Sequence, residues 1–560
     1  MKRHLAVLAT VFVLLIPTSG LFAAAQEEMA AEKMTFTWLG GGWNTEIVDD
    51  SWAEQIIQDK FDVEITPVNI LRSEKDKLNL LVASGDFPDV AYWNASDRYG
   101  LYSDGVTRSI PESFFRQYAP EYTRRLDQDF PWGWNYNLVP GMDDEYFSTT
   151  MWCVVCGGGI DYAPQFRMDW LEKIGMVPEG AFDMFPEASE VIDYKSETAD
   201  ARGKYHFYPS HPTLDWYEGV LRGFLNSDPD GNGKNDSIPL MLYGHWASHR
   251  GLMEMFGISY GRNLMEDGEL IQATISKNYR DYLKLLAGWY AEGLIDPEFT
   301  LLKGRGDAEE KFRSGVAGTF MMHYIYLTYY YKRWDSLFKN VPSAKVLMTL
   351  PIRNHDGRVG AYASDLDSVN SWTNYVVGAH VDDAKLAKFL EIYDWINFDP
   401  EQQVFLRYGL PDVHFEWNGD PWASRPRMKE GVEQGGGDQG LMVYPHGYET
   451  KELAALHGLP PGAEIVKPVL FDSITDIIIF PLRFDPQNKT NEQEVRKNYG
   501  SALKTIEDEY LVKAITGEVD IDSSWDDYVA QWRRAGGDEL LTEQAQGLLY
   551  DEFMNGNIVY

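Results

Sequence analysis

The residues with the most specific chemistry in this sequence are a run of oxygen-bearing side chains in a glycine-containing loop. Asp228, Asp230, Asn232 and Asp236 stand at positions one, three, five and nine of the loop, and Gly233 stands at position six. A hard cation such as Ca²⁺ takes about six to eight oxygen ligands, which alternate side chains of a tight turn can supply. The spacing therefore predicts a structural calcium site.

Two further positions of this loop, which spans residues 228–239, decide how complete the ligand set is. Lys234 stands at position seven, where the backbone carbonyl is the ligand. Position twelve is Pro239, where an EF-hand has a bidentate glutamate. We expect the missing carboxylate to come from elsewhere, or water to complete the shell. The alternative is a polar turn without metal.

The two cysteines of the chain, Cys153 and Cys156, have the C-x-x-C spacing of a redox motif. Three glycines follow them, and no compact domain with the motif at a helix start is visible, which disfavours thioredoxin-like chemistry. A zinc site would need two more ligands than this motif supplies. The sequence favours either buried thiols or a local structural disulfide, and leaves both open.

Other catalytic signals are weak. The chain has many carboxylates, so the acid pair of a glycosidase could be among them. The H-E-x-x-H motif and a phosphate-cradling loop are absent from the sequence. Isolated histidines such as His245, His323 and His414 are expected to be ordinary polar or core residues.

The overall composition limits the kinds of partner. Asp and Glu number 86 against 50 Lys and Arg, which gives a formal net charge of −36. A nucleic-acid-binding protein needs a basic face that displaces counterions, so we expect no nucleic-acid partner. Aromatic residues make up 14% of the chain, and Trp and Tyr can stack on the apolar faces of sugars. A chain of 560 residues also exceeds one core and predicts two or more folded units.

The start of the chain has the pattern of a secretory signal peptide. Lys2 and Arg3 precede the apolar run Leu5–Ile16, and small residues Ala23–Ala25 precede the expected cleavage near Gln26. An uncleaved membrane anchor is the alternative. Since no cysteine lies near the cleavage site, no lipid attachment is expected there. We therefore expect a mature protein that is free in a bacterial periplasm.

Strands and helices alternate in the first part of the chain. Strands are predicted at Met34–Leu39, Val63–Val68 and Asp89–Trp93, and helices at Ser51–Ile57 and Asp76–Ala83. The alternation predicts a parallel sheet covered by helices, with a ligand crevice at the carboxyl ends of the strands.

Longer helices follow this first part. Amphipathic patterns predict helices at Tyr279–Glu292, Ala384–Asn397 and Val495–Thr516, and apolar runs predict strands at Lys345–Leu350 and Tyr375–Ala379.

Several blocks together resemble the family 1 extracellular solute-binding proteins, in particular the large oligosaccharide-binding branch that includes alginate-binding members. These blocks are Leu78–Asp89, Arg167–Gly175, the Asp228 loop, Gly293–Phe299 and Ile515–Glu518, and they occur in family order. The resemblance implies an α/β protein with two lobes (a type II periplasmic binding protein fold), each a sheet flanked by helices, with a hinge between them.

The resemblance also implies a division of the chain. Residues 1–25 form the signal peptide, 26–160 and 376–480 form the first lobe, and 161–375 form the first part of the second lobe. Residues 481–560 add C-terminal helices to the second lobe.

A second likeness concerns the ligand. Residues Pro88–Gly100 resemble the P-D-x-x-x-W-x-x-D-R segment of maltose-binding members, in which the Trp, Asp and Arg contact the sugar. This likeness, with the aromatic and polar residues near strand ends, implies the following ligand-binding residues: Trp43, Asn44, Trp93, Asp97, Arg98 and Tyr324.

The function implied by the resemblance is capture of a carbohydrate, expected to be an oligosaccharide, by closure of the lobes. The protein would act as a monomer, pass its ligand to the membrane permease subunits of an ABC importer, and catalyse no reaction. The alternatives are a secreted carbohydrate-active enzyme, such as a glycoside hydrolase, and a redox protein. Uronate oligomers and neutral oligosaccharides both remain open as ligands.

Overall fold

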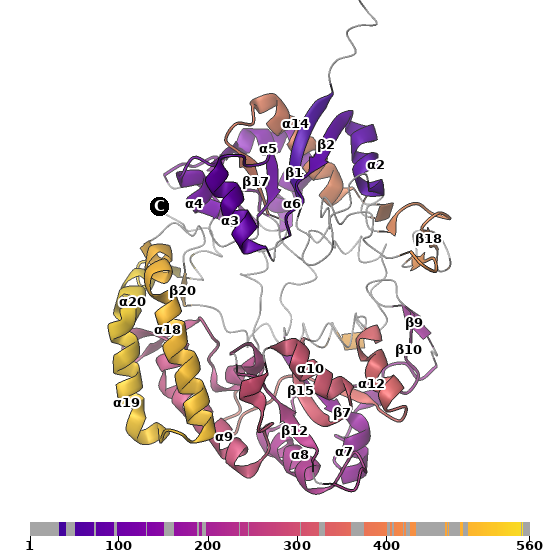
Figure 1. Ribbon diagram of the computed structural model, residues 1–560, viewed down its shortest axis with the longest axis vertical. Helices are drawn as coiled ribbons and strands as arrows, with labels where there is room; N and C mark the ends of the chain where they lie inside the picture. Colours follow the sequence, from indigo (N-terminus) through magenta and orange to yellow (C-terminus); the bar gives the residue numbers. More distant parts are fainter. Residues whose placement is uncertain are drawn as a thin grey trace, which may run out of the picture.

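The computed structural model shows two lobes, each built around its own β-sheet (Figure 1). The structure describes residues 33–40, 51–71, 74–93, 98–129, 131–139, 141–150, 162–187, 190–192, 198–234, 236–244, 246–302, 304–323, 331–359, 374–399 and 491–549, with shorter pieces between 402 and 484 and at 552. In this part of the chain, no helix is long and apolar enough to cross a membrane.

The sheet of the first lobe is mixed. Its strand order is β2 (Val63–Pro67), β1 (Met34–Leu39), β3 (Val90–Tyr92), β17 (Tyr375–Gly378) and β4 (Thr107–Arg108). Strands β1, β2 and β3 are parallel, whereas β17 runs antiparallel to both of its neighbours. The predicted parallel arrangement of the first three strands is confirmed, and β17 adds an antiparallel strand that the sequence did not predict for this sheet. The reason is that β17 returns from the second lobe and enters the sheet from the opposite end.

Helices flank this sheet: α2 (Trp52–Phe61), α3 (Lys75–Ser84), α4 (Arg98–Ser103), α5 (Glu112–Tyr118), α6 (Pro120–Asp129) and α14 (Asp383–Phe398). The predicted start of α2 is confirmed, because the Ser51 hydroxyl accepts a hydrogen bond from the Glu54 backbone N–H at 3.3 Å. The core of the lobe forms around Trp38, whose ring lies 5.6 Å from Tyr375 and 5.7 Å from Phe389. Helix α14 therefore covers a core to which β1 and β17, which are far apart in the sequence, both contribute.

The sheet of the second lobe has six strands. Their order is β12 (Ile238–Met241), β15 (Ala317–His323), β7 (Tyr162–Arg167), β16 (Val346–Thr349), β11 (Tyr205–Tyr208) and β8 (Phe182–Asp183). Strand β7, the first in sequence, lies in the middle and runs antiparallel to β15 and β16. All its residues are buried, which explains its lack of hydrophobic alternation.

Two groups of helices cover this lobe. The first consists of α7 (Met168–Ile174), α8 (Leu214–Asn226), α9 (Lys277–Glu292), α10 (Arg305–Arg313) and α12 (Asp335–Asn340). The second is the C-terminal group α18 (Asn491–Thr516), α19 (Ile521–Trp532) and α20 (Asp538–Gln544), which packs on α9 (Figure 1). The predicted helices in both groups are confirmed, and α18 begins four residues earlier than predicted.

A buried ion pair ties the start of α7 to the sheet. Arg167, the last residue of β7, donates from Nε and Nη2 to the two carboxylate oxygens of Asp169 at 2.9 and 2.7 Å. Its Nη1 donates to the Gly315 carbonyl at 3.0 Å, and its guanidinium lies over the ring of Trp170. Arg167 is 1% exposed. The R-x-D-W part of the block at Arg167–Gly175 therefore has a structural role.

We expect the variant Asp169→Ala to lose about 3–5 kcal/mol of unfolding free energy, because it leaves the Arg167 guanidinium buried without its carboxylate. Urea denaturation of the purified protein measures this loss. Glu172→Ala on the same helix is the matched control, since it removes a half-exposed partner of Lys345 and should cost about 1 kcal/mol or less. Equal losses in both variants would contradict a special role for the buried pair.

Candidate ligand-binding site

The two sheets present the ends of their strands to the segments that connect the lobes. In the first lobe, β3 ends where β17 begins, because Tyr92 pairs with Tyr375. In the second lobe, β15 ends where β7 begins, because His323 pairs with Tyr162. The chain leaves the first lobe after Thr150 and enters β7 at Tyr162, so these two edges adjoin the connections. They are the natural place for a ligand between the lobes.

A ladder of hydrogen bonds joins the connecting segments on the side of the first lobe. The Thr149 backbone N–H donates to the Tyr375 carbonyl at 3.0 Å, and the Tyr375 N–H donates to the Thr149 hydroxyl at 2.8 Å. The Trp93 N–H in turn donates to the Asn374 carbonyl at 2.9 Å. We refer to Trp93, Thr149, Asn374 and Tyr375 as the hinge ladder. The hinge ladder holds the segment that leaves the first lobe and the segment that returns to it at the same end of β3.

Trp93 follows β3 directly, as predicted, but its ring is packed in the lobe. It is 7% exposed and lies 5.8 Å from the ring of Phe87, in a cluster that includes Leu39 and Val376. Its indole N–H is buried and has no hydrogen-bond acceptor in the described part of the chain. Stacking of Trp93 on a sugar stays a prediction.

Arg98 is the first residue of α4 and is 4% exposed. Its Nη2 donates to the Asn137 side-chain oxygen at 3.4 Å, and its Nε is buried without an acceptor among the described residues. Burial lowers the pKa of the guanidinium to about 10. Arg98 therefore remains charged at neutral pH in a place from which water is largely excluded.

Asn137 is a residue that sequence reasoning missed. Its amide Nδ2 donates to the Thr149 carbonyl at 3.1 Å and to the Thr150 hydroxyl at 2.9 Å, and its backbone has a positive φ of 59°. It thus connects Arg98 with the segment that leaves the first lobe. No motif marks it, and asparagine's tolerance of positive φ was the one local signal available.

The remaining predicted ligand contacts, Trp43, Asn44, Asp97 and Tyr324, lie outside the described residues. The same holds for Cys153, Cys156 and His245. His414 is an ordinary polar residue, as expected, because its Nδ1 accepts a hydrogen bond from the Leu410 N–H at 2.9 Å.

The loop that supports the start of β7 contains a buried acid. Glu254 is fully buried; its carboxylate accepts hydrogen bonds from the Gly251 N–H and, at 3.0 Å, from the Ser259 hydroxyl. Burial raises the pKa of this carboxyl to about 7, although these bonds and the charge of Arg250 oppose the shift. Gly251 lies so close to Tyr162 that an added Cβ would be 3.4 Å from the Tyr162 carbonyl oxygen. The ionisation of Glu254 therefore takes place beside the entry to the second lobe.

The predicted calcium loop brings its acids together around one amide. Asn232 Nδ2 donates to Asp230 and to Asp236, both at 2.8 Å, and the Asn232 N–H donates to Asp228 at 3.1 Å. A hydrogen bond between Asp228 and Asp230 lowers the pKa of Asp228. Burial raises the pKa of Asp230, and the neighbouring Asp228 carboxylate raises it further. Gly233 has the positive φ, 79°, that the sixth position of such a loop requires.

The arrangement around Asn232 is not a closed metal site. Among the described residues, no group of three or more His, Cys, Asp or Glu side chains is placed to hold a metal ion. Lys234 and Pro239 supply no carboxylate. The Lys173 ammonium group donates to the Pro229 carbonyl and so attaches the loop to α7.

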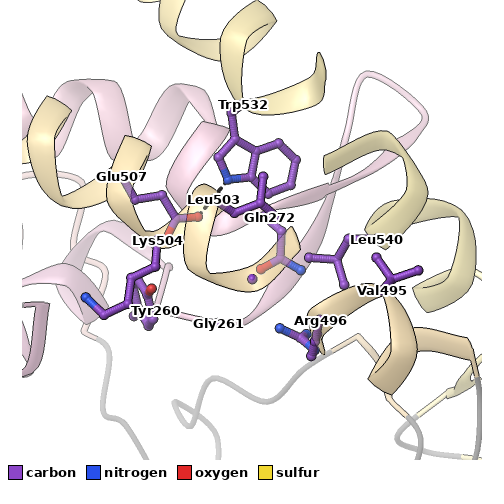
Figure 2. A pocket seen from close by; sticks show the side chains of 11 residues that line it. Tyr260, Gly261, Gln272, Val495, Arg496, Leu503, Lys504, Glu507, Trp532 and Leu540 are labelled. Carbon is purple, nitrogen blue, oxygen red and sulfur yellow. Dashed lines mark hydrogen bonds between the residues drawn. The ribbon is translucent and has the colours of Figure 1, made fainter. Parts of the chain in front are cut away.

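A cavity of about 70 Å³ lies beneath the C-terminal helices (Figure 2). Glu507, at its wall, accepts hydrogen bonds from Trp532 Nε1 at 2.7 Å and from the Thr274 hydroxyl at 3.0 Å, and Gln272 bonds to Gln544. The polar groups of the cavity are thus bonded to one another, and none of its lining residues is a predicted ligand contact. The cavity is better explained as packing space for water than as the ligand site.

Comparisons with known proteins identify the class to which this architecture belongs. No family model matches the chain. Lipoprotein LipO of Bacillus subtilis (strain 168) is 24% identical over 496 residues, which cover 84% of this chain and 83% of that protein. The fructooligosaccharide ABC transporter substrate-binding protein FusA of Streptococcus pneumoniae is 23% identical over 259 residues, which cover 44% of this chain and 41% of FusA.

Solved structures agree over almost the whole chain. FusA in complex with kestose superposes with a TM-score of 0.66 at 17% identity, covering 94% of this chain and 100% of FusA. Its EF-hand mutant in complex with fructo-nystose gives a TM-score of 0.65 at 17% identity, with coverage of 93% and 100%. The alginate-binding protein AlgQ2 without calcium ion gives 0.62 at 16% identity, with coverage of 92% and 98%. The chain therefore has the two-lobed fold of solute-binding proteins, and the predicted resemblance and fold are confirmed.

The buried Glu254 makes stability depend on pH. Its pKa in the folded protein lies above the ordinary value of 4.5, so its stabilising contribution is complete below pH 4.5 and is lost as the pH rises through about 7. The loss amounts to about 3 kcal/mol at most. We expect Glu254→Gln to reduce the decline in unfolding free energy between pH 5 and pH 8, because the amide stays neutral.

Urea denaturation at several pH values tests this expectation. Glu539→Gln, a change at an exposed position of α20, serves as the control and should follow the wild-type pH profile. Parallel profiles for the wild type and Glu254→Gln would show that Glu254 does not titrate in this range.

Proposed function

We propose that this protein is the solute-binding component of an ABC importer and captures an oligosaccharide between its lobes. The observation that carries the proposal is the pair of lobes, with the hinge ladder at the edge of the first one. This two-lobed fold is shared with FusA over the whole of the solved FusA chain. The names of FusA and AlgQ2 state fructooligosaccharide and alginate as what they transport or bind. A long saccharide suits a site formed between two sheet edges.

The proposed cycle depends on movement about the hinge ladder. Because both connecting segments leave from one hydrogen-bonded strand end, the second lobe can rotate while the first lobe stays intact. A ligand that contacts both edges favours the closed arrangement. The closed form then docks on the membrane permease subunits and releases the sugar to them.

The proposed ligand contacts are those implied by the sequence. Polar contacts to sugar hydroxyls come from Asn44, Asp97 and Arg98, and aromatic contacts come from Trp43, Trp93 and Tyr324. We propose binding without catalysis, because FusA, the relative whose name states a role, is a substrate-binding protein. A glycoside hydrolase is the alternative.

We also propose that the protein is exported by the signal peptide at residues 1–25 and acts as a periplasmic monomer. The sequence has no cysteine near the cleavage site. In this respect the proposal differs from the lipid attachment that the name of LipO, a lipoprotein, indicates for that relative.

Calcium is the proposed structural cofactor. The loop offers carboxylate oxygens from Asp228, Asp230 and Asp236, an amide from Asn232 and the Lys234 carbonyl, which are the hard oxygen donors that Ca²⁺ prefers. Crowding of Asp228 and Asp230 supports this fit, because a divalent cation would relieve the repulsion that now raises the pKa of Asp230 beyond the effect of burial. Bound Ca²⁺ would supply charge neutralisation and hold the loop against α7.

We expect Ca²⁺ to raise the melting temperature of the wild-type protein above its value in chelator. The variant Asp230→Ala should melt at the same temperature in both conditions, because it lacks a central oxygen ligand. Asp526→Ala, which removes an exposed carboxylate from α19, is the charge-matched control and should keep the response. A wild type that melts identically with Ca²⁺ and with chelator would rule out the site.

We expect at least one oligosaccharide to raise the melting temperature and to reduce the radius of gyration in X-ray scattering, because the ligand favours closed lobes. Saccharides that leave the melting temperature unchanged are the internal control and should leave the scattering unchanged. The bound oligosaccharide should be recovered intact by chromatography after prolonged incubation. Recovery of shortened products would instead support the hydrolase.

A further inference from the structure

Arg98 is a buried charge that has no counter-charge among the residues the structure describes. Arg98 is 4% exposed, and within the described ranges its side chain forms one hydrogen bond, the long one from Nη2 to Asn137 at 3.4 Å. No carboxylate of the described residues forms an ion pair with it, in contrast to Arg108, Arg116 and Arg167, which all contact acids.

Such an arrangement is unfavourable for the protein by itself. Taking a guanidinium out of water costs free energy that is recovered only when other groups satisfy its N–H donors. The nitrogen Nε of Arg98 has no acceptor among the described residues, and Asn137 offers a single neutral oxygen. The position is therefore better suited to a complex in which a second molecule supplies the missing acceptors.

The surroundings of Arg98 hold it in place for such a complex. Asn137 keeps a left-handed backbone, which is costly for a residue other than glycine, and its amide is fixed by Thr149 and Thr150. These two residues begin the connection to the second lobe. Arg98 therefore lies beside the hinge, at the lobe edge where the proposed ligand binds.

We infer that Arg98 is an anion-binding residue and that the transported saccharide carries carboxylate groups, as an oligomer that contains uronic acid does. The inference rests on the proposed function and narrows its substrate class. A guanidinium can also bind sugar hydroxyls, but its planar fork of N–H donors forms two parallel, charge-assisted hydrogen bonds with a carboxylate, and these are stronger than bonds to a neutral hydroxyl.

The net charge of −36 does not oppose this assignment. At physiological ionic strength, charges farther apart than about 8 Å are largely screened when they are exposed to solvent. A carboxylate that reaches Arg98 meets an unscreened positive charge at hydrogen-bond distance. The local pair then decides the affinity, and the distant acids mainly slow the approach of the ligand.

Titration calorimetry with trigalacturonate and its methyl ester tests the inference, because the ester keeps the sugar skeleton and removes the charge. Alginate trimers and maltotriose extend the comparison to other acidic and neutral trisaccharides. We expect the wild type to bind an acidic trimer about 30-fold or more tightly than its uncharged counterpart. Arg98→Met should bind both forms equally weakly, and Arg98→Lys should recover part of the preference.

Melting temperatures without ligand provide an independent readout. Arg98→Met removes an unpaired buried charge and keeps the length of the side chain, so the variant should melt at the wild-type temperature or higher. Arg124→Met is the control, because Arg124 forms an exposed pair with Glu121 on α6 of the same lobe. It should keep the wild-type preference for acidic trimers. A lower melting temperature for Arg98→Met would overturn the assignment of Arg98 as unsatisfied in the free protein.

The outcomes separate the inference from the proposed function. Tight binding of neutral oligosaccharides alone would overturn the acidic substrate class and leave the solute-binding role intact. Acidic binding that persists unchanged in Arg98→Met would overturn the role of Arg98. A protein that binds no saccharide in either series would overturn the proposed function, and the inference with it.

Discussion

The hinge ladder is the constraint on which the two-lobed arrangement depends. Thr149 and Tyr375 are far apart in sequence, yet the Thr149 N–H donates to the Tyr375 carbonyl and the Tyr375 N–H donates to the Thr149 hydroxyl. Each bond alone contributes little net stability, about 1 kcal/mol. Their effect is geometric, because they make the outgoing and returning segments start from one rigid strand end. The ladder lies beside the packed core around Trp38, to which Tyr375 belongs.

Acidic side chains in three of the blocks that carry the family resemblance form contacts that stabilise each lobe internally. Asp89 ends its block with a carboxylate that bonds to β1 and α14, and Arg167 and Asp169 form the buried pair at α7. In the next block, Asp296 is 1% exposed and accepts a hydrogen bond from Lys311 at 2.7 Å. Changes at these positions leave buried charges unpaired, so they are costly for any member of the fold.

The separation of interacting residues along the chain explains how much could be predicted from the sequence. The start of helix α2 and both ends of strand β1 were predicted correctly, because the cap at Ser51 and the local hydrophobic pattern determine them, whereas α2 extends four residues beyond the predicted end at Ile57. The direction of β17 could not be predicted, since it depends on a return from the other lobe. Asn137 was missed for the same reason, because its role comes from contacts with Arg98 and Thr149. A cap or a hydrophobic pattern within one element can be predicted from the sequence, whereas contacts between segments far apart in the chain cannot.

The net charge of the chain and the charge of Arg98 act over different distances. The acidic surface keeps the chain soluble and acts over a screened range, whereas a buried guanidinium acts over a few ångströms in a medium of low polarisability. A carboxylate at the surface pairs easily with lysine or arginine and loses little when it does not. Arg98 is buried and pairs with no acid among the described residues, so its desolvation is not offset within this part of the chain. Such strain persists in a fold when a bound state relieves it, and the state that relieves it here must bring acceptors to the edge of β3.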